Sequence, residues 1–191
     1  MIKGRMEAFS DGVFAIVITI MVFDLKAPIG SDAAALMSIF PAVLTYLLSF
    51  VYLGLYWNNH HHLLQLTDHV NGRILLANLH LLFWLTLIPF GTAWMRGTDF
   101  ASLPVAVYGG ILFLSSIAWA VLQSAIISDQ GPKSPIREAV GRDWKGIVSS
   151  LLYLIAIGFS FRIPPVAVAI FAFVALFWLI PDRRFEARTR R

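Results

Sequence analysis

Six long apolar segments constrain the fold of this chain more than any other feature of its sequence. A helix needs about 20 apolar residues to cross the hydrocarbon core of a bilayer. Apolar residues make up 58% of the chain and charged residues only 14%, whereas a soluble domain is about half apolar and about a quarter charged. The sequence therefore predicts an all-α, polytopic membrane protein, with one six-helix domain over residues 1–191. The expected helices cover residues 6–25, 34–57, 74–95, 103–127, 147–161 and 164–180.

Positive charges predict how these helices cross the membrane. Six crossings would place both termini on one side, where twelve Lys and Arg residues would lie against three on the other side. Cytoplasmic loops carry the excess of positive charge, so both termini are expected in the cytoplasm. The pI of 9.7 follows from these basic residues. They are expected to contact anionic lipid, so the pI gives no reason to expect nucleic acid. The twelve are Lys3, Arg5, Arg73, Lys133, Arg137, Arg142, Lys145, Arg183, Arg184, Arg188, Arg190 and Arg191, and the three are Lys26, Arg96 and Arg162.

The cysteine content and the longest loop give two further expectations. The chain has no cysteine, which excludes disulfides, thiolate metal sites and cysteine nucleophiles. The longest loop, over residues 128–145, predicts a short amphipathic helix at the cytoplasmic surface over residues 136–145.

Ser10 and Asp11 are unusual because they lie just inside the first apolar segment. A charge at that depth needs a partner and is by default a candidate for function. Arg5 is six residues from Asp11, about 120° around a helix, so the two do not face each other. The predicted topology brings Ser10 and Asp11 to the same depth as the end of the second segment and the start of the third. We therefore expect Asp11 to pair with Trp57 or with a histidine that follows it.

Three histidines follow Trp57, and the sequence leaves three roles open for them. With Asp11, Asn78 and Trp57 they would form a hydrogen-bond network that fixes helix packing. The same network would serve as a pH-responsive gate, because histidine titrates near neutral pH. A metal site is the weakest alternative, because adjacent residues of a helix do not face one way and no zinc or di-iron motif accompanies them. The three are His60, His61 and His62.

An apolar stripe follows Asp11 on the first helix. At 100° per residue, Ile16, Thr19, Ile20 and Phe23 fall within about 60° of Ile16, whereas Asp11 lies about 140° away from it. The stripe is either a lipid-facing or packing surface, or the working face of the helix. Asp24 at the outer end would raise the local concentration of cations at a mouth, or it is simply a solvated helix terminus.

Arg5 with Phe9, Ser10 and Asp11 forms an RxxxFSD pattern at the start of the first helix. This pattern resembles the signature of the endosomal/lysosomal potassium-channel family and its prokaryotic homologues. The similarity covers the whole six-helix unit, although its specific motifs lie within residues 5–92. Further agreements are Trp57 with His60-His61, Asn78, and Pro89-Phe90 with Thr92.

The resemblance implies a potassium-permeable cation channel in the plasma membrane of a prokaryote. A chain with one six-helix unit is then expected to form a homotetramer, with its pore on the symmetry axis and K⁺ or other monovalent cations as permeant ions. No cofactor is implied. The first helix would line the pore, with its constriction at Ile16 and with Thr19 and Ile20 next along. A structural network behind the pore would comprise Arg5, Phe9, Ser10, Asp11, Trp57, His61 and Asn78, with His60 as a weaker match than His61.

No carbonyl filter motif of the TVGYG type occurs in the sequence, so rings of backbone carbonyls are not the expected basis of selectivity. A ring of apolar side chains that gates by size and dewetting, with a hydroxyl ring from Thr19, is the hypothesis in its place. Three other classes stay open on the sequence alone. They are a secondary transporter, a membrane enzyme that uses Asp11, His60 and His61, and a membrane assembly protein that conducts nothing.

Overall fold

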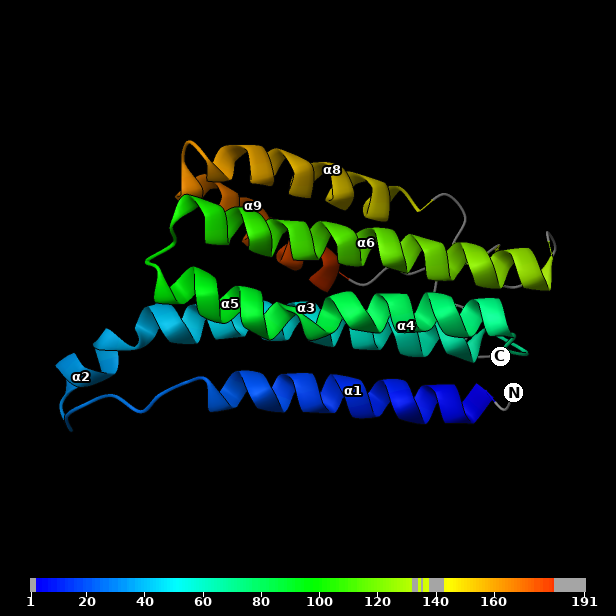
Figure 1. Cartoon of the computed structure of the whole chain (residues 1–191), viewed down its shortest axis with the longest axis horizontal. Helices are drawn as coiled ribbons and strands as arrows, with labels where there is room; N and C mark the ends of the chain where they lie inside the picture. The colour runs from blue at the N-terminus through cyan, green and yellow to red at the C-terminus, as the bar shows by residue number, and fades with distance from the viewer. Residues whose placement is uncertain (1–2, 132–133, 135, 138–142, 181–191) are drawn as a thin grey trace.

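The computed structural model describes residues 3–131, 134, 136–137 and 143–180, and over this part of the chain every regular element is a helix. The helices run side by side, with α1 along one edge and α8 and α9 toward the opposite edge (Figure 1). In chain order they are α1 (Lys3–Phe23), α2 (Ala33–Ser38), α3 (Phe40–Gln65), α4 (Gly72–Thr86), α5 (Ile88–Gly97), α6 (Ser102–Gln130), α8 (Trp144–Ser160) and α9 (Pro164–Leu179).

Four helical stretches are long and apolar enough to cross a membrane. They are α1, α3, the α4–α5 pair over Gly72–Gly97, and α6. Helices α8 and α9 are also apolar, but they have only 17 and 16 residues. At 1.5 Å per residue they are about 25 Å long, a little less than the 30 Å hydrocarbon core. The chain is thus an all-α, multi-pass membrane protein.

Two of the expected helices are interrupted near a proline. The segment expected at 34–57 divides into α2, which is capped by the Asp32 carboxylate, and α3, whose first turn contains Pro41. The segment expected at 74–95 divides at Leu87, and Pro89 lies in the first turn of α5. A proline has no N–H to donate and fits the first turn of a helix, so both interruptions follow from its chemistry.

Helix α3 corrects the expected end of the second segment. The sequence predicts an end at Trp57, yet α3 continues through the histidines to Gln65. Two polar side chains of this continuation have hydrogen-bond partners. His60 is bonded to Asn78 of α4 at 2.7 Å, and His61 is bonded to Gln65 one turn further along α3 at 2.8 Å.

Helix α6 is the centre of the bundle and packs against α4, α5, α8 and α9. Gly109 permits the closest approach. A Cβ atom there would lie 2.8 Å from the ring of Phe171 in α9 and 2.9 Å from Ile157 in α8. Ser116 of α6 is also hydrogen-bonded to Ser150 of α8 at 2.8 Å. These contacts join α6, α8 and α9 into one tightly packed body.

Two predictions fall on residues that the structure does not describe. The surface helix expected over 136–145 includes residues 138–142, which lie outside the described part, and α8 begins at Trp144. The basic tail, with its five arginines between residues 183 and 191, lies entirely outside it.

Candidate functional site

The apolar stripe of α1 faces away from the rest of its own chain. Ile16 is 61% exposed, Ile20 53% and Phe23 81%. The opposite side of α1 is buried and consists of Met6, Ser10, Phe14, Val17 and Met21. Helix α1 therefore packs with one face only and leaves the stripe for lipid, for another copy of the chain or for a pore.

Thr19 lies in this stripe and is also exposed. Its hydroxyl donates to the carbonyl oxygen of Ala15 at 2.7 Å. The hydroxyl proton is thus occupied within the helix, and the exposed oxygen is left to accept a hydrogen bond from outside α1.

A buried chain of hydrogen bonds connects α1, α4 and α3 near the start of α1. The Asn78 amide nitrogen donates to the Ser10 hydroxyl at 3.0 Å, and the Ser10 hydroxyl donates to the carbonyl oxygen of Met6 at 2.8 Å. The Asn78 amide oxygen accepts from Nε2 of His60 at 2.7 Å. Ser10, His60 and Asn78 are 0–2% exposed. Because an amide oxygen only accepts, the His60 tautomer in this arrangement carries its proton on Nε2.

Asp11 lies beside this chain and has its own partner on α3. The Trp57 indole N–H donates to Oδ1 of Asp11 at 2.9 Å. Trp57 is one of the partners that the sequence predicts for Asp11. His61 stacks on Trp57 with ring centroids 6.2 Å apart. The buried chain therefore contains His60. The resemblance favoured His61 for the network, and His61 instead stacks on Trp57.

Arg5 and Phe9 are not brought into this arrangement. Arg5 is exposed and makes no hydrogen bond or ion pair with any residue that the structure describes. Phe9 is 56% exposed. Within one chain, both side chains lie on the outer surface of α1.

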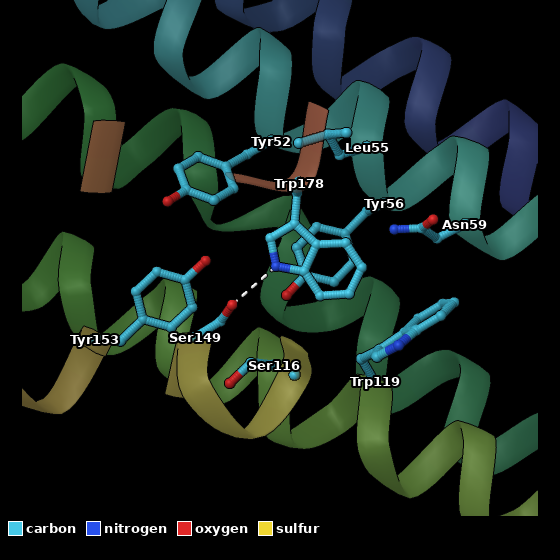
Figure 2. A pocket seen from close by; sticks show the side chains of 10 residues that line it. Tyr52, Leu55, Tyr56, Asn59, Ser116, Trp119, Ser149, Tyr153 and Trp178 are labelled. Atoms are coloured by element: carbon cyan, nitrogen blue, oxygen red, sulfur yellow. Dashed lines mark hydrogen bonds between the residues drawn. The ribbon is translucent and has the colours of Figure 1, made fainter. Parts of the chain in front are cut away.

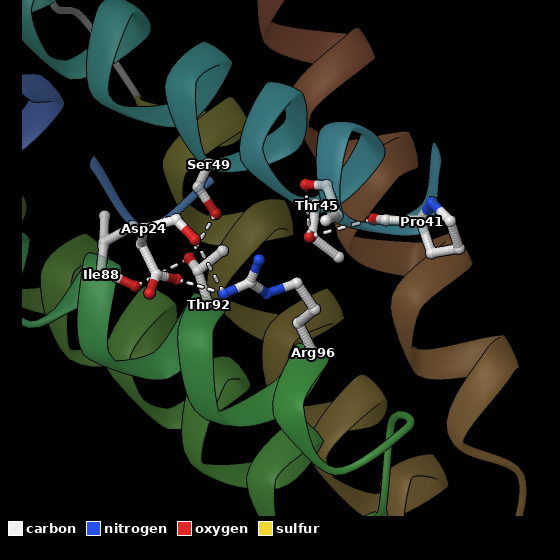
Figure 3. Close-up of polar contacts among 8 residues, drawn as sticks. Asp24, Pro41, Thr45, Ser49, Ile88, Thr92 and Arg96 are labelled. Atoms are coloured by element: carbon white, nitrogen blue, oxygen red, sulfur yellow. Dashed lines mark hydrogen bonds and ion pairs between the residues drawn. The ribbon is translucent and has the colours of Figure 1, made fainter. Parts of the chain in front are cut away.

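The far end of α1 is held by an ion pair that the sequence does not reveal. Arg96 of α5 donates to the Asp24 carboxylate and, at 3.2 Å, to the Asp24 backbone carbonyl (Figure 3). Asp24 follows the last residue of α1, so Arg96 caps carbonyl groups that a helix end leaves unpaired and compensates a negative charge at the negative end of the helix dipole. Asp24 is thus already partnered within its own chain.

A second buried chain, made of hydroxyl groups, fixes α5 to the body of the protein. Ser49 of α3 lies 2.6 Å from the Thr92 hydroxyl of α5 and 3.0 Å from the Tyr108 hydroxyl of α6. Thr92 donates to the carbonyl oxygen of Ile88 at 2.8 Å, so the protons run from Tyr108 to Ser49 to Thr92. Hydroxyl residues within apolar segments are the sequence signal for such a chain. Of the three residues, only Thr92 belongs to the motifs noted in the sequence.

No metal centre is evident among the residues that the structure describes, since no three His, Cys, Asp or Glu side chains are grouped there to hold an ion. The histidines of α3 engage in hydrogen bonds and ring contacts in place of a shared ion.

Comparison with known proteins matches this arrangement to one family. Residues 5–89 match the family model described as the endosomal/lysosomal potassium channel TMEM175. A curated potassium channel from Chryseobacterium sp. is 52% identical over 186 residues, which cover 97% of each chain. This chain belongs to the TMEM175 family. Members of the family are named as channels, so the chain is not an enzyme.

A solved TMEM175 structure has the same fold. The crystal structure of a lysosomal potassium-selective channel TMEM175 homologue from Chamaesiphon minutus is similar with a TM-score of 0.82 and 30% identity. The similarity covers 93% of this chain and 96% of that one. The endosomal/lysosomal proton channel TMEM175 of Rattus norvegicus is 31% identical over 160 residues, which cover 74% of this chain and 32% of the rat protein.

Proposed function

We propose that this protein is a potassium-permeable cation channel of a prokaryotic plasma membrane and that it works as a homotetramer. The observation that carries the proposal is the exposed stripe of α1, on a helix whose opposite face is buried and whose two ends are tied to α3, α4 and α5. Its relative from Chryseobacterium is named a potassium channel.

A single copy of α1 cannot enclose a pore, so the proposed function requires closed cyclic symmetry. Four copies of the stripe would then surround the axis. Ile16 and Ile20 would form apolar rings at the constriction, Thr19 a hydroxyl ring between them, and Phe23 a wider ring toward the outer mouth. Such rings would control permeation by size and dewetting in place of a carbonyl filter.

The proposed topology has six crossings and cytoplasmic termini. It rests on the charge bias of twelve against three and on six apolar helical stretches, of which α8 and α9 would cross a locally thinner bilayer. In this orientation the Ser10–Asn78–His60 chain lies at the cytoplasmic end of α1, and the Asp24–Arg96 pair lies at the outer end.

Substitution of Ile16 tests the constriction. Ile16→Asn places a polar side chain in the narrowest ring, so we expect larger currents and a lower preference for K⁺ over Na⁺ in planar bilayers. The matched control is Val22→Asn, because Val22 is exposed on the same helix but lies about 120° away from Ile16. Unchanged conductance and selectivity in Ile16→Asn would show that the constriction lies elsewhere.

Single-channel recording also separates this proposal from the other transport classes. Currents above about a million ions per second exceed what domain motions of a microsecond or longer allow and would exclude a secondary transporter. The absence of any current in a correctly assembled protein would favour an assembly role. Protons are the second permeant ion to examine, because the rat relative is named a proton channel.

A further inference from the structure

Two faces of α6 carry hollows of very different size. One is a small pocket that Tyr56, Trp119 and Trp178 help to line (Figure 2). It has about 40 Å³, which is room for water molecules only. The other is an open groove between α4 and α6, with a volume of about 860 Å³. Of the two, only the groove falls within the range of about 300–1,000 Å³ that is typical of sites for organic ligands.

The groove is polar at one end and apolar further along. Arg73 lies in the first turn of α4, and Asp129 lies near the end of α6. Closer to the middle of both helices, Leu76, Ile117 and Val121 line the groove. The α4–α5 stretch has 26 residues, so it is about 39 Å long and exceeds the hydrocarbon core by about 9 Å. Arg73 is therefore expected at the level of the lipid headgroups, and the apolar part at the depth of the acyl chains.

The charged groups at the polar end differ in their partners. Asp129 is already engaged, because Oδ1 accepts from the Asn71 amide at 2.6 Å and Oδ2 accepts from Nε2 of His69 at 2.7 Å. Arg73 is exposed and forms no ion pair with any residue that the structure describes. The guanidinium group is therefore free to donate, and a phosphate, which only accepts, is its complement in shape and charge.

His80 offers a second donor deeper in the groove. The Trp84 indole N–H donates to Nε2 of His80 at 3.0 Å. The neutral imidazole then carries its proton on Nδ1, which makes no hydrogen bond within the described part of the chain. His80 follows Arg73 by seven residues, so the two lie on one face of α4, about 10 Å apart along the helix axis. A glycerophospholipid presents its acceptors in the same order, with the phosphate outermost and the ester carbonyls below it.

We propose that this groove binds one membrane glycerophospholipid. Its phosphate accepts hydrogen bonds from the Arg73 guanidinium, and one of its ester carbonyls accepts from Nδ1–H of His80. One acyl chain lies along Leu76, Ile117 and Val121, where van der Waals packing holds it. This binding does not rest on the proposed channel function.

Native mass spectrometry of the full-length protein, with dioleoylphosphatidylglycerol added to the detergent solution, tests the site. We expect saturable binding of one lipid per chain, and an affinity about tenfold lower in Arg73→Gln because a charge-assisted hydrogen bond is lost. His80→Phe should lower the affinity about fivefold, since one neutral hydrogen bond is lost. Ala120→Trp fills the groove from α6, where Ala120 is exposed, and should abolish saturable binding.

Two matched control variants lie outside the groove. Arg162→Gln removes another exposed arginine, in the turn between α8 and α9, and Leu151→Trp enlarges a side chain of α8 that is 55% exposed. Both should bind the lipid as the wild type does. Two control ligands separate the parts of the lipid. Dioleoylglycerol, which lacks the phosphate, should bind about tenfold more weakly, and glycerol 3-phosphate, which lacks the chains, should not compete. Circular dichroism checks that each variant is folded.

Several results would overturn the site. An absence of saturable binding to the folded wild type would mean that something else, such as a second copy of the chain, covers the groove. Equal affinities of the wild type and Arg73→Gln, or equal affinities for the lipid and dioleoylglycerol, would show that the phosphate is not recognised. Saturable binding by a folded Ala120→Trp would place the lipid elsewhere, and competition by glycerol 3-phosphate would indicate a site for free phosphate. Because the measured quantity is the mass of bound lipid, each of these results leaves the proposed channel untouched, and an absence of current leaves the lipid site untouched.

Discussion

The two ends of α1 are held by different kinds of interaction. At one end, Ser10, Asn78 and His60 form a neutral hydrogen-bonded chain that is almost completely shielded from solvent. At the other end, Asp24 and Arg96 form an ion pair whose side chains are 46% and 23% exposed. The two attachment points, at Asp11 and Asp24, are about 20 Å apart along the helix.

This difference bears on which end of the helix can move. A buried polar group left without its partner costs about 1–3 kcal/mol, and salt does not screen it. An exposed ion pair contributes about 0–1 kcal/mol and weakens as salt rises. The Ser10 end should therefore be the fixed point of α1, and the Asp24 end the adjustable one.

The largest effect is expected from breaking the buried chain. Asn78→Leu removes the donor to the Ser10 oxygen and the acceptor of the His60 Nε2–H, so we expect a loss of about 2 kcal/mol in the free energy of unfolding. Reversible unfolding in mixed micelles measures it. Leu79→Ala is the control, because Leu79 is the neighbouring side chain on α4 and is 48% exposed. Equal losses in the two variants would show that the buried chain contributes nothing specific.

An intermediate effect is expected at the Asp11–Trp57 contact. Trp57→Phe removes the indole donor and should lower stability by about 1 kcal/mol. Asp11→Asn keeps an acceptor oxygen but removes the charge, so its effect should be smaller, while still lowering the temperature at which the proposed tetramer dissociates in detergent. Chemical cross-linking before and after heating measures this. A tetramer that is indifferent to both substitutions would argue against a structural role for the contact.

The smallest effect is expected at the outer ion pair. Arg96→Gln should cost about 0.5 kcal/mol at low salt and almost nothing at about 1 M salt, where the screening length falls to about 3 Å. The exchange of charges in Asp24→Arg with Arg96→Asp should restore part of the loss at low salt. If Arg96→Gln instead costs as much as Asn78→Leu, and does so at every salt concentration, the proposed contrast between the two ends is wrong.

Local patterns in the sequence predicted much of the fold. The helical period alone placed Ile16, Thr19, Ile20 and Phe23 on one face of the first helix and Asp11 away from it. The structure shows Ile16, Ile20 and Phe23 exposed and Asp11 bonded to α3. The proline positions also indicated where helices begin, although the sequence did not predict that Pro41 and Pro89 would divide two segments.

Partners between helices were harder to predict. Arg96 was counted only as one of three outer positive charges, because nothing in its neighbourhood indicates that α5 brings it to the end of α1. The choice between His60 and His61 depends on the rotation of α3, and one residue changes the facing direction by about 100°.

The orientation of one hydroxyl group has a consequence for the sign of the permeant charge. Because the Thr19 proton is directed to the Ala15 carbonyl, the hydroxyl can only accept a hydrogen bond from a group outside α1. Four such oxygens around an axis would form a collar that accepts hydrogen bonds and offers none. In the proposed tetramer such a collar would be electronegative throughout, so it would repel chloride between the two apolar rings even in the absence of any charged residue.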